Sequence, residues 1–128
     1  MQKKILIVDD EAHIRMLIEQ TLEDLEDEGV EFFSADNGEK ALQLIQSEKP
    51  DLVFLDVMMP KMNGMDVCSL VKKDDSLKDV FVILLTAKGQ DFDRQKGQEV
   101  GANLYMTKPF DPEAILLKAI EVLGLKQQ

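Results

Sequence analysis

The sequence predicts an α/β protein, a three-layer (βα)5 doubly wound parallel sheet with strand order 2-1-3-4-5. Strand and helix patterns alternate five times along the chain, which favours a parallel sheet with helices on both faces. Three strand-like runs are continuously apolar, as expected for strands buried on both sides, and two are mixed or short, as edge strands tend to be. In this order, the direction in which successive strands are added to the sheet reverses between the first and third strands.

The elements follow from periodicity and from turn residues. The expected strands cover residues 4–9, 30–35, 51–56, 80–85 and 103–106. The expected helices cover residues 11–27, a segment opened by Asn37-Gly38, residues 64–72, a weak helix at about 91–100, and a last helix starting at Asp111-Pro112-Glu113. Apolar residues recur at helical spacing in the first helix. The last helix begins with a cap residue, a proline in the first turn and early negative charge.

Composition limits the possible functions. The 128 residues predict one domain, 1–128, and the net charge of −10 argues against direct binding to nucleic acid or acidic lipid. No apolar run approaches the ~20 residues of a membrane span. A strand pattern begins at Ile5, which excludes a signal peptide. The single cysteine, Cys68, excludes an internal disulfide and fits a reducing cytosol, so we expect a cytoplasmic location.

Polar residues come at the ends of four predicted strands. Asp9 and Asp10 follow the first strand, Asp56 the third, Thr86 the fourth and Lys108 the fifth. Ligands of open parallel sheets bind beyond the carboxyl ends of the strands. We therefore expect three carboxylates, one hydroxyl and one ammonium at a single edge, a site for a divalent cation and a phosphoryl group.

Crowded carboxylates favour a metal, because they cannot all stay ionised unaided. Mg2+, with Mn2+ possible, suits one or two carboxylates, several waters and a phosphate oxygen. We expect Asp10 and Asp56 to be direct ligands, Asp9 to act through water, and the backbone carbonyl of Met58 to contribute. The alternative for Asp9-Asp10-Glu11 alone is a cap on the following helix.

Asp56 is the best nucleophile of the chain, since a carboxylate needs no general base to attack phosphorus. The metal and Lys108 would offset charge on the transferring oxygens, and Thr86 could donate a hydrogen bond to one of them. An exposed lysine before a turn proline is the alternative for Lys108.

These residues stand in motifs that resemble one family. The motifs are Val8-Asp9-Asp10-Glu11, Asp56-Val57-Met58-Met59-Pro60-Lys61-Met62-Asn63-Gly64, Thr86-Ala87 and Lys108-Pro109-Phe110. They are similar, across the whole chain, to the signatures of response-regulator receiver domains, the CheY-like modules of two-component signalling.

The resemblance implies a phospho-accepting switch that assists its own phosphorylation and dephosphorylation, rather than an enzyme acting on a separate substrate. Asp56 would accept a phosphoryl group from a sensor histidine kinase or phosphotransfer protein, with Mg2+ held at Asp9, Asp10, Asp56 and the Met58 carbonyl. Thr86 and Lys108 would contact that group. Tyr105 matches the aromatic switch position that moves with Thr86; an edge-strand tyrosine with a wet hydroxyl is the alternative.

The resemblance also implies an output. The surface formed by the fourth helix, the fifth strand and the last helix would control a downstream target or a fused output domain. The competing hypotheses are a flavodoxin-like cofactor binder, an aspartyl-phosphate phosphatase, and a degenerate receiver that only docks. Whether the chain stands alone or is the N-terminal domain of a longer regulator stays open.

Overall fold

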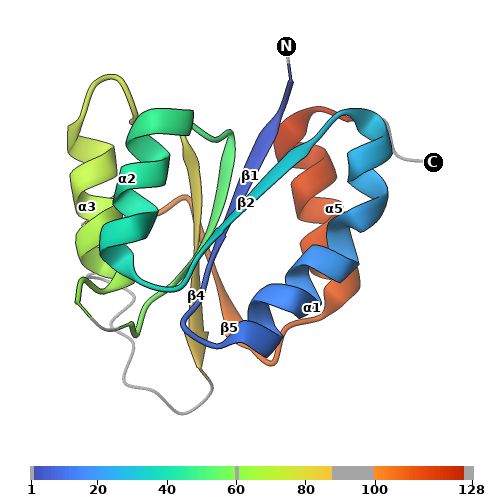
Figure 1. Cartoon of the computed structure of the whole chain (residues 1–128), viewed down its shortest axis with the longest axis horizontal. Helices are drawn as coiled ribbons and strands as arrows, with labels where there is room; N and C mark the ends of the chain where they lie inside the picture. The colour runs from blue at the N-terminus through green and yellow to red at the C-terminus, as the bar shows by residue number, and fades with distance from the viewer. Residues whose placement is uncertain (1, 60, 88–99, 126–128) are drawn as a thin grey trace.

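A five-stranded parallel sheet with the order β2-β1-β3-β4-β5 forms the centre of the molecule, which confirms the predicted fold class (Figure 1). The computed structural model describes residues 2–59, 61–87 and 100–125. The strands are β1 (Lys4–Val8), β2 (Glu31–Ala35), β3 (Leu52–Asp56), β4 (Phe81–Ala87) and β5 (Leu104–Lys108). As predicted, the mixed and short strands β2 and β5 lie at the edges.

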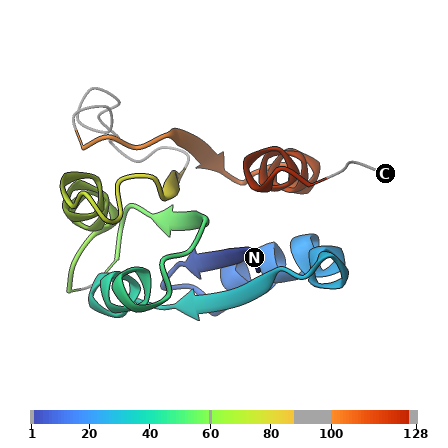
Figure 2. The same cartoon turned by 90° about the horizontal axis from the view of Figure 1, so that it is seen from above.

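Helices cover both faces of the sheet. Helices α2 (Gly38–Glu48) and α3 (Gly64–Lys73) lie on one face, and α1 (Ala12–Leu22) and α5 (Pro112–Leu123) lie on the other (Figures 1 and 2). Because side chains of a strand alternate between faces, β1 supplies both cores. Its Leu6 and Val8 belong to the cluster under α2 and α3, whereas Ile5 and Ile7 belong to the cluster under α1 and α5.

The first helix is shorter than predicted. It ends at Leu22 and continues as a 3-10 helix, η1 (Glu23–Glu28), which ends at Gly29 with a φ of 85°. η1 is rich in acidic residues, and negative charge at the C-terminal end of a helix opposes its dipole. The acidic segment thus stays helical without continuing the α-helix. The helix expected at about 91–100 lies largely outside the described residues.

Side-chain caps begin three of the helices. Asn37 accepts a hydrogen bond from the Lys40 amide at 2.9 Å and begins α2, as its sequence predicted. Asp111 accepts from the Glu113 amide at 3.0 Å and begins α5, with Pro112 in the first turn. Asn63 begins α3 by accepting from the Asp66 amide at 2.9 Å.

Two predicted strands end later than the apolar pattern suggested. β4 continues through Thr86 to Ala87, and β5 continues to Lys108, because the backbones of these polar residues remain paired: Thr86 is opposite Thr107 and Ala87 opposite Lys108. Asp56 is likewise the last residue of β3. Asp56, Thr86 and Lys108 are therefore fixed by the sheet itself, whereas Asp9 and Asp10 lie in the turn that follows β1.

Cys68 is fully buried in the core under α2 and α3, as expected for a lone structural cysteine. In the part of the chain that the structure describes, no helix has the length and apolar character needed to cross a membrane.

Candidate functional site

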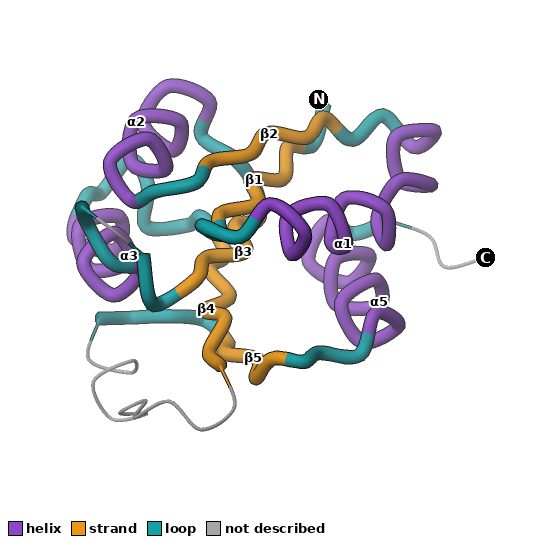
Figure 3. Tube along the Cα trace, turned by 60° about the horizontal axis from the view of Figure 1, so that its bottom comes forward, coloured by secondary structure: helices purple, strands orange, loops and turns teal. Residues whose placement is uncertain are grey.

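Three polar side chains are buried at the carboxyl edge of the sheet, where Figure 3 shows β1 leading into α1 and β5 leading toward α5. Among the described residues, Asp9, Asp56 and Thr86 are the buried polar or charged ones, with exposed fractions of 0%, 3% and 5%. The Lys108 ammonium joins them, with Nζ 2.6 Å from Asp9 Oδ2 and 3.5 Å from Asp56 Oδ1. The predicted convergence of distant residues on one pocket is present.

Asp9 connects four parts of the fold. Its amide donates to the Ala35 carbonyl at the end of β2 (3.2 Å), and its carbonyl accepts from Arg15 Nη1 in α1 (2.6 Å). Its Oδ1 accepts from the Glu11 amide at 2.9 Å, and its Oδ2 binds Lys108. Both carboxylate oxygens thus have protein partners, an arrangement that fits a role organising the pocket from within. The bond to the Glu11 amide also gives Asp9 part of the alternative capping role.

An acidic cluster opens from this buried residue to solvent. The carboxylate oxygens of Asp9, Asp10 and Glu11 lie within 4.8 Å of one another, and Asp10 and Glu11 are exposed. A set of carboxylates with two solvent-facing members fits Mg2+, which keeps several waters when bound to proteins. Glu11 was not among the predicted ligands, although its position directly after Asp10 was a usable signal.

Asp56 stands in an environment that opposes its ionisation. Burial raises the pKa of Asp56 to about 7, with the charge of Asp9 and a hydrogen bond with Asp10 acting in the same direction. The Lys108 ammonium and the Met58 amide, which donates to Asp56 Oδ1 at 3.2 Å, lower the pKa but do not outweigh these effects. One ammonium is therefore too little positive charge for the carboxylates gathered here, and a divalent cation would supply what is missing.

Lys108 is held in place from both sides. Burial alone would lower the pKa of its ammonium, but the hydrogen bond to Asp9 and the charge of Asp56 raise it above the usual value. The Lys108–Pro109 peptide bond is cis. The ammonium points into the pocket, so the exposed-lysine alternative does not describe this residue.

Thr86 and Tyr105 lie on neighbouring strands. The Thr86 hydroxyl donates to the Met106 carbonyl of β5 at 3.5 Å, and half-buried Tyr105 stands opposite Leu84 in the β4–β5 ladder. A movement of the Thr86 side chain away from β5 would thus break a contact with the strand that carries Tyr105. Their switching role stays a prediction, as does the use of the Met58 carbonyl as a ligand.

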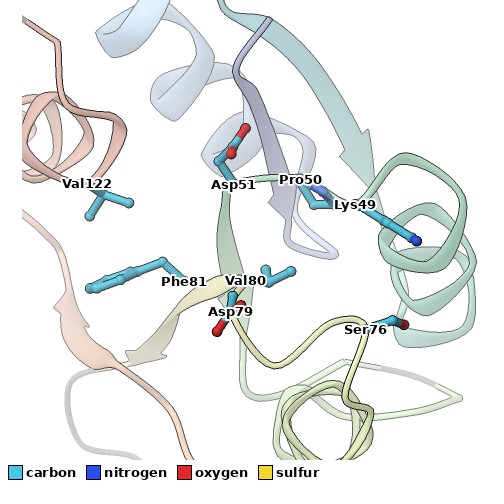
Figure 4. Close-up of a pocket in the computed structure, with 8 residues that line it drawn as sticks. All are labelled: Lys49, Pro50, Asp51, Ser76, Asp79, Val80, Phe81 and Val122. Atoms are coloured by element: carbon cyan, nitrogen blue, oxygen red, sulfur yellow. The ribbon is translucent and has the colours of Figure 1, made fainter. Parts of the chain in front are cut away.

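A separate pocket of about 330 Å³ lies at the opposite edge of the sheet, where β3 and β4 begin. Figure 4 shows that the charged side chains of Lys49, Asp51 and Asp79 point in different directions rather than toward a common centre. Asp51 already accepts a hydrogen bond from the Lys4 amide at 2.8 Å. This pocket has no cluster of groups that would bind one ligand.

Comparison with known proteins gives the family. The family model described as "Response regulator receiver domain" matches residues 5–121. The chain belongs to this family. The alkaline phosphatase synthesis transcriptional regulatory protein PhoP of Bacillus subtilis is 42% identical over 123 residues, 96% of this chain and 49% of that protein. The phosphate regulon transcriptional regulatory protein PhoB of Pseudomonas aeruginosa is 42% identical over 121 residues, 94% of this chain and 52% of that protein.

Solved receiver structures share the fold. The chemotaxis response regulator CheY4 of Vibrio cholerae has a TM-score of 0.81 at 33% identity, covering 95% of this chain and 99% of that one. The fold is therefore the flavodoxin-like CheY arrangement. The chain spans about half the length of the curated relatives it matches.

Membership in the receiver family decides against the flavodoxin-like cofactor binder and the aspartyl-phosphate phosphatase, and it leaves open a degenerate receiver that only docks. Receiver domains are signalling switches of two-component systems, and the family binds Mg2+ at an acidic pocket such as the one formed by Asp9, Asp10 and Glu11. A flavin-binding flavodoxin or a phosphatase of the aspartyl-phosphate kind is not what the chain is similar to.

The sequence analysis did not identify Arg15. The contact of Arg15 with Asp9 is a hydrogen bond from a side chain to a main-chain carbonyl, and such a bond leaves no motif in the sequence.

Proposed function

We propose that this receiver domain accepts a phosphoryl group on Asp56 from the phosphohistidine of a sensor histidine kinase or phosphotransfer protein, in an Mg2+-dependent reaction. The observation that carries the proposal is the Lys108 ammonium bound between Asp9 and Asp56 at the buried edge of the sheet. A nucleophilic carboxylate, an acidic pocket and a fixed cation stand side by side there. Phosphoryl transfer depends mainly on such positioning and electrostatics.

Each residue of the site has its own role in this reaction. A carboxylate oxygen of Asp56 attacks phosphorus, the phosphorus–nitrogen bond of the donor breaks, and the imidazole takes the bonding electron pair and leaves as a neutral ring that keeps the proton of its other nitrogen. Lys108 offsets negative charge on the transferring oxygens, and the Thr86 hydroxyl turns from the Met106 carbonyl to one of them. Mg2+, held by Asp10, Asp56 and the Met58 carbonyl, and by Asp9 through water, would supply further positive charge when bound.

The high pKa of Asp56 supports the requirement for a cation. An attacking carboxylate must be ionised, and a pKa of about 7 leaves a large protonated fraction at neutral pH. A divalent cation beside Asp56 favours the ionised form and would bring the pKa back toward its usual range. Metal binding would thus prepare the nucleophile as well as neutralise the transferred group.

The output would be a change in the surface formed by the fourth helix, β5 and α5. Thr86 and Tyr105 are the proposed switch pair, since phosphorylation would draw the Thr86 hydroxyl away from β5. The fourth helix is expected at about residues 91–100, and residues 88–99 lie outside the described part of the chain. A stable phosphoryl mimic should change amide exchange around residues 89–106.

We further propose that residues 1–128 are a single receiver domain that acts in the cytoplasm and does not itself bind nucleic acid. Its target is either a separate protein or a fused output domain. A fused domain is supported by the matches to about half of PhoP and PhoB, both named transcriptional regulatory proteins. The net charge of −10 disfavours direct contact with nucleic acid by this part of the protein.

Intact-mass measurement after incubation with a small-molecule phosphodonor and Mg2+ tests the proposal. We expect a gain of one phosphoryl group, its loss in Asp56→Asn, and its loss when Mg2+ is replaced by a chelator. Asp79→Asn, an exposed acid at the opposite edge of the sheet, is the matched control and should be phosphorylated normally. Equal phosphorylation of Asp56→Asn and the native chain would refute the assignment.

A further inference from the structure

We infer that Arg15 is a positioning residue for the acidic cluster and sets its affinity for divalent cations. Arg15 lies in the first turns of α1, and its Nη1 donates a 2.6 Å hydrogen bond back to the main-chain carbonyl of Asp9. This short bond carries the charge of the guanidinium, which makes it stronger than a neutral hydrogen bond. It spans the turn that holds Asp10 and Glu11, two of the three clustered carboxylates.

The turn between β1 and α1 is also held by Asp9, whose Oδ1 accepts a hydrogen bond from the Glu11 amide at 2.9 Å. Glu11 is the N-cap residue of α1, but its side chain makes no capping bond, and the first turn of the helix contains no acidic residue. The Arg15 amide also donates to the Glu11 carbonyl at 3.2 Å, so the same residue is anchored in the helix and bound to the end of the strand. Arg15 therefore links the start of α1 to the end of β1 and fixes the spacing of the carboxylates in the turn between them.

The positive charge of Arg15 and its hydrogen bond to the Asp9 main chain predict opposite effects on the affinity for cations. A guanidinium beside an acidic cluster repels an incoming cation, so the charge alone makes binding weaker. A clamp on the Asp9 main chain holds the carboxylates in place before the cation arrives, which makes binding tighter. The bond goes to a carbonyl rather than to a carboxylate, and this favours the clamp. The sign of the change on removing Arg15 separates the two roles.

Calorimetric titration of the metal-free chain with Mg2+, and separately with Mn2+, measures this sign. For Arg15→Met, which keeps the apolar stem of the side chain, we expect roughly 10-fold weaker binding of both ions. Arg15→Lys, which keeps the charge and one donor, should recover part of the loss. Lys118→Met removes one positive charge from α5 and should bind both ions as the native chain does.

The inference rests on the proposed Mg2+ site, to which the acidic cluster contributes Asp10 directly and Asp9 through water, and the titration tells the two apart. A native chain that binds neither ion overturns the proposed site and the inference together. A native chain that binds, with Arg15→Met binding equally or more tightly, overturns the inference alone. If circular dichroism shows that Arg15→Met does not fold, Arg15→Gln gives the same test of sign with a smaller change.

Discussion

Lys108, the last residue of β5, and Asp9, the residue that follows β1, form a 2.6 Å ion pair across 99 residues of sequence. β1 and β5 are separated by β3 and β4, so the lysine side chain reaches across the carboxyl ends of both. The Asp9 side chain is 0% exposed and that of Lys108 13%. The pair therefore couples one edge strand to the centre of the sheet through two desolvated charges.

Replacing Lys108 by methionine should destabilise the metal-free protein. It leaves Asp9 and Asp56 buried without their cation, and breaking a buried pair from one side costs about 3 kcal/mol. Urea denaturation in the presence of a chelator measures the loss. The double variant Asp9→Asn with Lys108→Met should be more stable than the Lys108→Met single variant, because one of the two uncompensated carboxylates is gone. Additive losses in the double-mutant cycle would show that the two residues are not coupled.

The metal-free protein should lose stability through Asp56 as pH rises from about 4 to about 7. The pKa of Asp56 is raised from 3.8 to about 7 by burial first, so the folded state binds more protons than the unfolded state in this window. Asp56→Asn should remove this slope and, at pH 8, stabilise the protein by on the order of 3 kcal/mol.

Urea denaturation in the presence of a chelator, at pH 5 and at pH 8, measures the free energy of unfolding of the native chain and of Asp56→Asn. The difference between the two proteins isolates Asp56, because the other carboxylates titrate in both. The stabilisation by Asp56→Asn should be much larger at pH 8 than at pH 5. Equal differences at the two pH values would mean that Asp56 is ionised throughout.

The strand order and the convergence of the site could be predicted because both follow from the apolar pattern. Continuous apolar runs marked the three central strands, and acidic residues marked the carboxyl ends of two of them, β1 and β3. The ends of β4 and β5 could not be read in this way. Thr86 and Lys108 are polar, but their backbones are still paired with a neighbouring strand, and pairing depends on the whole sheet.

The sequence predicted that the crowded carboxylates cannot all stay ionised, but it did not predict the contact of Arg15 or that Asp56 is a carboxylate with a raised pKa. A bond from a side chain to a main-chain carbonyl depends on the path of the backbone rather than on the identity of the residue that accepts it. The pKa of Asp56 depends on a balance among burial, two acids and one lysine, and that balance is set by distances. The sequence predicted which groups lie together, whereas the strength of the interactions among them depends on distances that only the structure gives.

Mg2+ should stabilise the protein and release protons as it binds. A cation that binds only the folded state adds about 2.7 kcal/mol at a concentration 100 times its dissociation constant. Because the pKa of Asp56 is about 7, binding at pH 7 should displace roughly half a proton from this residue, and very little at pH 8.5. Titration calorimetry in buffers of different ionisation enthalpy measures this number. Asp56→Asn should release none, and unchanged release would place the titrating group elsewhere.

Gly64→Ala should disturb the phosphoacceptor strand directly. A Cβ added at Gly64 would lie 2.2 Å from the carbonyl oxygen of Asp56, so the main chain of β3 or of α3 must move. Overpacking of this kind costs ~1–3 kcal/mol, and the shift should also slow phosphorylation of Asp56. Gly29→Ala is the matched control, since it introduces only the strain of a positive φ of 85° with nothing within 4 Å of the new methyl group.

Both glycine variants should lose stability in urea, but Gly29→Ala should keep the native rate of phosphorylation from a small-molecule donor. The distinction follows from location, because Gly29 follows η1, at the end of the molecule away from the pocket, while Gly64 packs on the last residue of β3. A Gly64→Ala variant with the native rate at saturating Mg2+ would show that the Asp56 carboxylate is held independently of the main chain beneath it. The Asp56 carboxylate would then be held by its own contacts with Lys108, the Met58 amide and Asp10.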